Sequence, residues 1–379
     1  MRITNTLAFG LAAALAPVAV SALPKYVMQE ISVDASTPLT VAGLNNRGQV
    51  LGYATTANPY STIAYVTGAN GQGMNLITGP GGVTASPIAI NDSGQVLGFT
   101  ADGSFLTGPD GQNPMPLPEP ASGRFYPYAV NANGEVAGSV YPRPALGQFG
   151  EAAAVTGPNG AGLTELGTLG GWFGRAYGIN ASGQLAGSSN SAPSAADPVG
   201  MTQAFITDPG GANMRSIGSL AGLETEAYGI NASGQIVGSS WLSDHSGMHA
   251  IMTGPNGTNL VDIGTALPGF SIGIGINASG QVVGIYDDPG SGSTAIRDFV
   301  TDANGANATL LDALIVNNPA GYVFVGWQSG IYINDLGQIA AEAVTPDGLR
   351  AFLLTPVPVP AALWLFAPAL VALRRLALR

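Results

Sequence analysis

Short hydrophobic runs alternate with clusters of glycine, asparagine and proline along all 379 residues of the chain. Tyr228–Gly238 shows the pattern most fully, with Tyr-Gly-Ile before Asn-Ala-Ser-Gly and Gln-Ile-Val-Gly after it. Two such runs around a four-residue polar turn predict a β-hairpin. Asparagine at the first turn position can hydrogen-bond the turn backbone, and glycine at the fourth tolerates a positive φ. The stretch therefore predicts a strand, a tight turn and a returning strand.

The same hairpin recurs from one end of the chain to the other. Its asparagines are 46, 40, 49, 51, 46 and 57 positions apart, a period typical of repeat architectures. A second glycine in the returning strand of six copies predicts close packing or a bulge there. Turn chemistry accounts for the motif, so we interpret it as structural and not catalytic. The repeat asparagines are Asn45, Asn91, Asn131, Asn180, Asn231, Asn277 and Asn334.

A second hairpin follows in each repeat. A short strand ends in Thr, as at Ala204–Thr207 and Ala250–Thr253, and a turn of Gly, Pro or Asn residues leads into another strand. Two hairpins give four antiparallel strands, the content of a β-propeller blade. The predicted fold class is all-β, a seven-bladed β-propeller of four-stranded antiparallel blades. Six or eight blades, a β-solenoid and a pair of β-sandwiches are the alternatives.

The last repeat ends at Thr355, one strand short of a blade. Tyr26–Val33 precedes the first motif and has the composition of a strand. We predict that it pairs with residues 350–355 and closes the ring, since an open array would leave exposed strand edges.

The first 22 residues are predicted to be a secretory signal peptide. Arg2 precedes an apolar run from Leu7 to Val20, and small residues precede a cleavage site at Leu23. A first core helix is the alternative. Residues 23–356 would then form the propeller domain.

Residues 357–379 form the third predicted segment. A Val-Pro-Val-Pro motif precedes an apolar run of 13 residues, short for a stable membrane span of about 20, and two arginines follow it. This order resembles the PEP-CTERM sorting signal of Gram-negative bacteria in its VPxP form, with Val359 where the name-giving motif has Glu. The resemblance implies transient membrane insertion through a short C-terminal helix, processing by an exosortase and release to the cell surface or extracellular matrix, with a plain tail anchor as the alternative. The residues that carry it are Val357, Pro358, Val359, Pro360, Arg374 and Arg375.

The repeats themselves also resemble a known family. Copies of Ile-Asn-x-x-Gly-Gln-Val-x-Gly followed by an Ala-Phe strand are similar to the HAF-repeat family, whose members are described as extracellular. Only His249–Ile251 keeps the name-giving histidine, whereas other copies begin Ala-Tyr or Ala-Phe. The family carries no activity that the resemblance could transfer.

Composition narrows the classes of function. Charged residues are 9% of the chain, apolar residues 46%, and there is no cysteine, which excludes disulfides and thiolate sites. Residues 23–356 hold 8 basic and 23 acidic residues, so electrostatics disfavours nucleic acid as a partner.

Candidate chemistry is sparse. His245 and His249 have the i, i+4 spacing of a zinc pair, but on a predicted loop instead of a helix. Asp92, Asp335 and the pair at Asp287–Asp288 offer oxygen ligands without the spacing of a calcium loop. No cofactor or metal is therefore expected, with Ca²⁺ as the alternative.

Two aromatic segments are expected in connections between blades, where propellers usually bind ligands. Rings and guanidinium groups there would form a surface for stacking a saccharide or peptide, although the rings could instead pack between blades. We therefore predict a non-enzymatic surface or matrix protein that binds polysaccharide or protein partners, with an extracellular propeller hydrolase or lyase as the alternative. The candidate residues are Arg124, Phe125, Tyr126, Trp172, Phe173 and Arg175.

Overall fold

The computed structural model describes residues 23–33, 39–55, 62–142, 150–194, 200–267, 269–288, 295–326 and 330–357. The predicted signal helix, the predicted C-terminal membrane helix and the sorting residues after Val357 lie outside these ranges. Within them, no helix is both long enough and apolar enough to span a membrane.

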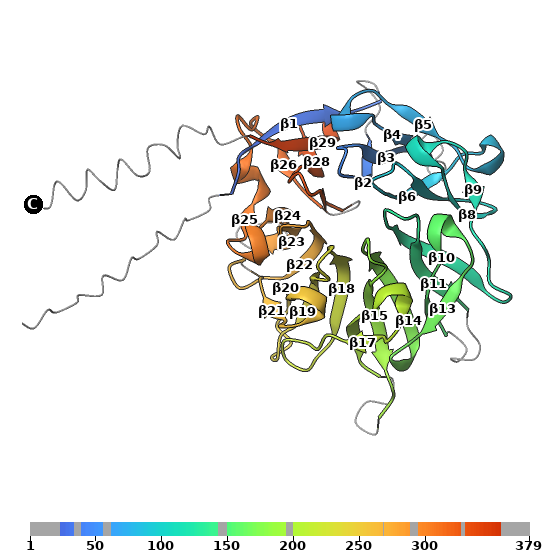
Figure 1. Cartoon of the computed structure of the whole chain (residues 1–379). Coiled ribbons are helices and arrows are strands. Elements are labelled where there is room, and N and C mark those ends of the chain that lie inside the picture. The colour runs from blue at the N-terminus through green and yellow to red at the C-terminus, as the bar shows by residue number, and fades with distance from the viewer. Residues whose placement is uncertain are drawn as a thin grey trace, which may run out of the picture.

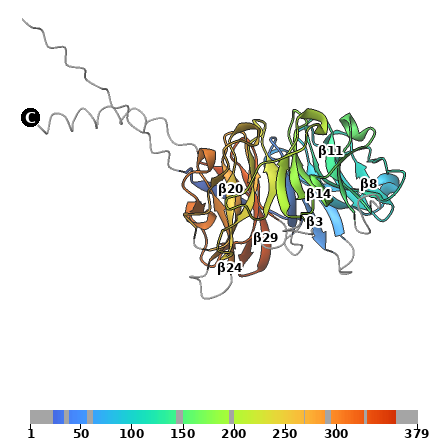
Figure 2. The same cartoon turned by 90° about the horizontal axis from the view of Figure 1, so that it is seen from below.

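Seven antiparallel sheets surround a central axis as the blades of a propeller (Figure 1). Viewed at right angles, the ring is wider than it is thick (Figure 2). In six blades the four strands follow one another in sequence order, from the axis outward. The seven-bladed, all-β prediction is thus confirmed.

Blades 1 to 3 cover the first part of the ring, and each begins with the strand that leads into a repeat asparagine. Their strands are β2 (Thr40–Leu44), β3 (Val50–Thr55), β4 (Thr62–Val66), β5 (Asn75–Ile77), β6 (Ser86–Ile90), β7 (Val96–Thr100), β8 (Gly103–Leu106), β9 (Met115–Pro116), β10 (Arg124–Val130), β11 (Val136–Tyr141), β12 (Ala152–Val155) and β13 (Thr164–Gly167).

Blades 4 to 6 repeat the same arrangement. Their strands are β14 (Gly170–Ile179), β15 (Leu185–Ser191), β16 (Thr202–Ile206), β17 (Arg215–Ser216), β18 (Thr225–Ile230), β19 (Ile236–Trp241), β20 (Met248–Met252), β21 (Val261–Asp262), β22 (Ser271–Ile276), β23 (Val282–Asp288), β24 (Ala295–Val300) and β25 (Thr309–Leu310).

The seventh blade joins the two ends of the described chain. Its outermost strand, β1, pairs with β29, so that Tyr26 lies opposite Pro356 and Ile31 opposite Ala351. The predicted closure is confirmed. The innermost position is divided between β26 and β27, which both pair with β28. The strands are β1 (Tyr26–Ile31), β26 (Val323–Phe324), β27 (Tyr332–Ile333), β28 (Ile339–Thr345) and β29 (Gly348–Pro356).

Turn chemistry sets both hairpins of a blade. In the first, the Asn231 side-chain oxygen accepts the amides of Ser233 and Gln235 at 3.0 Å each, and Gly234 has φ 73°. In the second, Asn256 takes the left-handed conformation before the final glycine, with φ 54°, because Asn tolerates that region. The short 3₁₀ turns are η1 (Ala69–Gly71), η2 (Pro80–Gly82), η3 (Pro109–Gly111), η5 (Pro158–Gly160), η6 (Pro209–Gly211), η7 (Pro255–Gly257), η9 (Ala303–Gly305) and η10 (Leu311–Leu314).

The apolar core is divided among the spaces between blades. Each of the seven buried clusters draws side chains from two neighbouring blades. In β16, Phe205 packs toward blade 3 and the adjacent Ala204 toward blade 5. Close approach also explains the second motif glycine, since a Cβ at Gly238 would lie 1.9 Å from the Glu226 carbonyl oxygen.

Candidate ligand-binding site

The first strands of the blades line the central channel. At the end where these strands turn, the residue before each repeat asparagine is aliphatic, and these side chains form the wall of a funnel with a volume of about 290 Å³. The funnel residues are Leu44, Ile90, Val130, Ile179, Ile230, Ile276 and Ile333.

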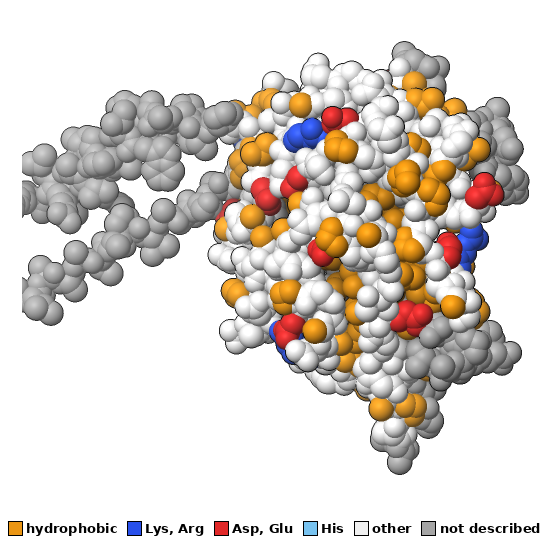
Figure 3. All heavy atoms as spheres, turned by 45° about the vertical axis from the view of Figure 1, so that its right-hand side comes forward, with side chains coloured by type: hydrophobic (Ala, Val, Ile, Leu, Met, Phe, Trp, Pro, Cys, Tyr) orange, Lys and Arg blue, Asp and Glu red, His pale blue; other side chains and the backbone are white. Residues whose placement is uncertain are grey.

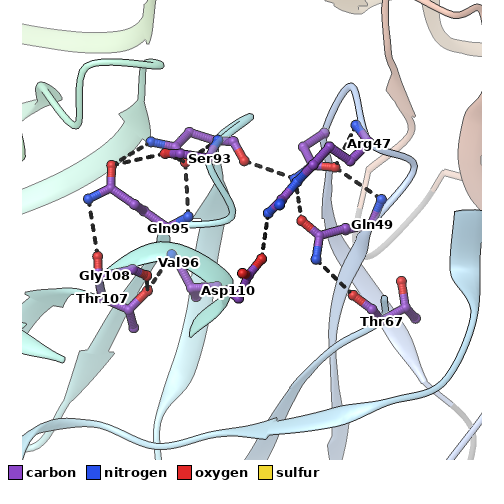
Figure 4. Close-up of polar contacts among 11 residues, drawn as sticks. Arg47, Gln49, Thr67, Ser93, Gln95, Val96, Thr107, Gly108 and Asp110 are labelled. Carbon is purple, nitrogen blue, oxygen red and sulfur yellow. Dashed lines mark hydrogen bonds and ion pairs between the residues drawn. The ribbon is translucent and has the colours of Figure 1, made fainter. Parts of the chain in front are cut away.

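A closed ring of hydrogen bonds joins the seven repeat asparagines at this funnel. Each side-chain Nδ2 donates to the main-chain carbonyl of the asparagine in the next blade, at 2.8 to 3.2 Å, and Asn334 completes the circle by donating to Asn45. We call this the asparagine ring. Figure 4 shows its setting in blades 1 and 2, where Gln49 and Gln95 continue the hydrogen bonds to Thr67 and Thr107.

The asparagine ring uses its polar atoms internally. Asn45 accepts two amides through Oδ1 and donates through Nδ2 to Gln49 as well as to the next blade. On one rim of the funnel, Asn46 binds Asp92 on one side and Asp335 on the other, at 2.9 Å each from its Nδ2. The carboxylates at this mouth therefore have hydrogen-bond donors and hold neighbouring blades together.

A second cavity, of about 140 Å³, lies between blades 3 and 4. It is near the starts of β10 and β14, hence toward the face opposite the asparagine ring. Three tyrosine rings surround one carboxylate and one guanidinium group there. The lining residues are Tyr126, Tyr128, Tyr141, Glu151 and Arg175.

An ion pair is the polar centre of this cavity. Arg175 donates to Glu151 through Nε at 2.6 Å and through Nη2 at 2.8 Å. Glu151 is buried and also accepts a 2.6 Å hydrogen bond from the Ser139 hydroxyl. The hydrogen bonds that Arg175 donates to Glu151 raise the pKa of the guanidinium. The guanidinium lies 5.0 Å from the centre of the Phe173 ring, a cation–π contact.

Three tyrosines extend this site toward blade 5. Tyr128, Tyr177 and Tyr228 each stand three residues before a repeat asparagine, and their ring centres are 5.2 and 6.0 Å apart. Burial raises the pKa of all three hydroxyls, so they remain protonated hydrogen-bonding groups at neutral pH. We call these residues the tyrosine arc. The other four blades carry Ala42, Ile88, Ile274 and Ile331 at this position.

The predicted aromatic residues lie on first strands, not in the connections between blades. Arg124, Phe125 and Tyr126 belong to β10, and Trp172, Phe173 and Arg175 belong to β14. The location was wrong because β14 extends over ten residues, with a register shift between Gly170 and Gly174 that keeps the extra segment paired.

Only part of the predicted set comes together. Tyr126 and Arg175 line the cavity, and Phe173 contacts Arg175. Phe125 is 1% exposed between blades 2 and 3, and Arg124 lies instead over the Phe99 ring.

The tyrosine arc, Glu151 and Glu226 were not singled out from the sequence. The sequence does contain a signal for the arc. In the three repeats that have Tyr three positions before the repeat asparagine, the second motif glycine, in the returning strand, is followed by Ser. Those serines are Ser139, Ser188 and Ser239.

The histidines and acidic turns do not form a metal centre. Across the described ranges, no group of three or more His, Cys, Asp or Glu side chains could hold a metal ion. His249 Nδ1 lies 2.9 Å from Asp262, whereas His245 contacts the Trp241 ring with centres 6.4 Å apart.

No family model and no curated protein matches the chain. Among solved structures it is similar to the β-propeller domain of the Trilobed protease from Pyrococcus furiosus (TM-score 0.59, 8% identity, 84% of this chain and 93% of that chain). It is also similar to puromycin hydrolase (TM-score 0.53, 13% identity, 88% of this chain and 55% of that chain), so the chain spans about half of that protein's length. A third similar structure is YCF48 bound to a D1 peptide (TM-score 0.51, 11% identity, 89% of this chain and 98% of that chain). At these identities the likeness concerns the fold alone, and the chain has the fold of a β-propeller.

Proposed function

We propose that this protein is a non-enzymatic binding propeller, exported to the cell surface or extracellular matrix, whose partners are polysaccharides or proteins. The observation that carries the binding function is the cavity between blades 3 and 4. Its tyrosine rings offer flat apolar faces beside fixed hydrogen-bonding groups, which is the usual composition of a recognition site.

The polar groups of this cavity favour recognition over catalysis. Both oxygens of Glu151 already accept hydrogen bonds from Arg175, and Arg175 is held in one orientation by that pair and by Phe173. Such a pair presents a rigid pattern of donors and acceptors, while a general base must reach a substrate proton.

Pull-down of extracellular polysaccharides and surface proteins tests the binding function. Tyr126 is 40% exposed and lines the cavity, so Tyr126→Ala should lower capture at least tenfold without lowering the melting temperature. Met115→Ala, on the outermost strand of blade 2 and 67% exposed, is the control and should bind normally. Turnover of a polysaccharide or peptide by the purified protein would instead establish a hydrolase or lyase.

The proposed export rests on the sequence at the two ends. Signal peptidase and an exosortase would be the processing partners, with the C-terminal segment inserted in the membrane only transiently. Mass spectrometry of the secreted protein should then show a chain that starts near residue 23 and lacks the residues after about 356. Retention of both ends would contradict this route.

A further inference from the structure

We propose that the ligand of the cavity and tyrosine arc is an uncharged saccharide, and that anionic polysaccharides are rejected. This inference rests on the proposed binding function and narrows its ligand class. It follows from which side chains face the channel in blades 3 to 5, and from how their charges are paired.

Tyrosine and serine hydroxyls come together in three adjacent blades, on the strands nearest the channel. Each blade of the tyrosine arc places a serine on its second strand. Two of these serines hydrogen-bond the hydroxyl of the tyrosine in the same blade. Ser139 Oγ lies 3.4 Å from the Tyr128 hydroxyl, and Ser239 hydrogen-bonds Tyr228. Tyrosine and serine hydroxyls can both donate and accept. A polyhydroxylated ligand needs such two-way partners along its length.

A hydrogen-bonded network connects these groups across the blades. It runs from Tyr128 through Ser139 and Glu151 to Arg175, which in turn lies in hydrogen-bonding reach of the Tyr177 hydroxyl. Each step fixes the orientation of the next group, so the donors and acceptors are arranged before a ligand arrives. Preorganisation of this kind lowers the entropy lost on binding.

The charges at the site disfavour an anion. Arg175 is the cation of the cavity, and Glu151 occupies it with two hydrogen bonds. In blade 5, Glu226 accepts a hydrogen bond from Tyr228 and adds a negative charge to the arc. A uronate or sulfate would therefore face excess negative charge. On the side of the molecule shown in Figure 3, acidic and basic side chains are few and scattered, so no basic surface there would attract an anionic polymer.

The size of the cavity suits one sugar ring. Its volume of about 140 Å³ equals that of roughly five liquid water molecules. Neighbouring sugar units would lie over Tyr177 and Tyr228, whose rings continue from Tyr128 along the channel wall. The ligand is thus expected to be an oligomer, not a monosaccharide.

Calorimetric titration of the secreted protein with length-matched probes tests the inference. The neutral probes are cellohexaose, mannohexaose and maltohexaose, and the anionic probe is a hexamer of galacturonic acid. At least one neutral hexamer should bind, and Tyr228→Phe and Arg175→Lys should each weaken it at least fivefold. Tyr65→Phe, in the third strand of blade 1, is the matched control and should bind as the natural protein does.

A charge variant separates the ligand class from the binding function. Glu226→Gln keeps an acceptor for Tyr228 but removes the negative charge, so galacturonate binding should rise at least threefold. Glu165→Gln, exposed on the outermost strand of blade 3, should leave it unchanged.

The outcomes distinguish the two proposals. Tight galacturonate binding that is lost with Arg175→Lys would overturn the uncharged ligand but keep the binding function. Capture of protein partners alone, with no saccharide bound, would also overturn it. If neither saccharides nor proteins bind, both proposals fail.

Discussion

Asp298 occupies a position that carries alanine in five other blades and is 1% exposed. Neither carboxylate oxygen has a hydrogen bond of good geometry. Burial raises its pKa well above the ordinary value; Asp312 and Glu342 raise it further, and the Gly326 amide opposes them. The nearby Arg297 guanidinium is engaged by Asp312 at 3.2 Å. Folding therefore favours the protonated acid. The equivalent alanines are Ala64, Ala153, Ala204, Ala250 and Ala351.

This burial should make stability depend on pH. Below the unfolded-state pKa of about 4, Asp298 is protonated in both the folded and the unfolded state, and its burial then lowers the free energy of unfolding least. As pH rises from there toward the raised folded pKa, the unfolded state alone ionises and stability is lost. Asp298→Ala should raise the free energy of unfolding at pH 7 by about 1–3 kcal/mol and reduce the loss of stability with rising pH.

Urea titrations from pH 4 to 8 measure the free energy of unfolding of both proteins. Asp102→Ala, at an exposed position, is the control. Equal stability of Asp298→Ala and the natural protein at pH 7 would contradict the account.

Asn231 illustrates the cost of altering the asparagine ring. Its Nδ2 donates to Gln235 at 2.8 Å and to the Asn277 carbonyl at 3.0 Å. Asn231→Asp would turn an oxygen toward both acceptors, and each stranded acceptor costs about 1–3 kcal/mol. We expect a clear fall in melting temperature. Glu135→Gln, which restores the glutamine of the other repeats, should change stability by less than about 0.5 kcal/mol; a comparable fall there would argue against this explanation.

Among the elements, β1 closes the ring as the outer edge of blade 7. Ile31 is 3% exposed and packs into the seam between blades 7 and 1, whereas Val27 in the same strand is 50% exposed. Burial of a side chain like Ile31 contributes about 1.5–3 kcal/mol. Ile31→Asp should therefore lower the melting temperature and increase hydrogen exchange in β29, while Val27→Asp should do neither. Equal exchange in the two variants would show that β1 does not hold the ring closed.

The strands were predictable where local chemistry decides them. The Asn-x-x-Gly and Gly-Pro-Asn-Gly turns revealed the hairpins, and the incomplete seventh repeat revealed the closing strand. The extension of β14 was not predictable, because its glycines read as a loop while register shifts keep it paired. The division of the innermost strand of blade 7 between β26 and β27 left no clear pattern either. The site was only half predictable: Tyr126 and Arg175 were named, but their meeting with Glu151 and Tyr141 depends on packing between two blades.

At the scale of the whole molecule, Asn46 joins blades on both sides of the seam. It binds Asp92 of blade 2 through its amide nitrogen and side chain, and its Oδ1 accepts the amide of Asp335 in blade 7 at 2.7 Å. The residue after the repeat asparagine is alanine in four other blades, so these bonds are concentrated in blades 7, 1 and 2.

Asn46→Ala should loosen the ring at this seam. Exposed polar contacts contribute modestly, so we expect a loss of about 1–2 kcal/mol and faster hydrogen exchange in β1, β2 and β29. Asn133→Ala removes one exposed hydrogen bond between blades 3 and 4, at 3.4 Å, and serves as the control. Faster exchange spread evenly over all seven blades would contradict a local effect.

The pairing of β1 with β29 also fixes where the chain leaves the ring. The Val357 amide donates to the Lys25 carbonyl at 2.7 Å, so the two ends of the propeller depart side by side from the rim of blade 7 (Figure 1). In a ring of seven, the space between blades 3 and 4 is diametrically opposite blade 7. A tether at either end would therefore hold the molecule by one edge and leave the cavity across the central channel from that edge, where a long polymer could bind without meeting the anchorage.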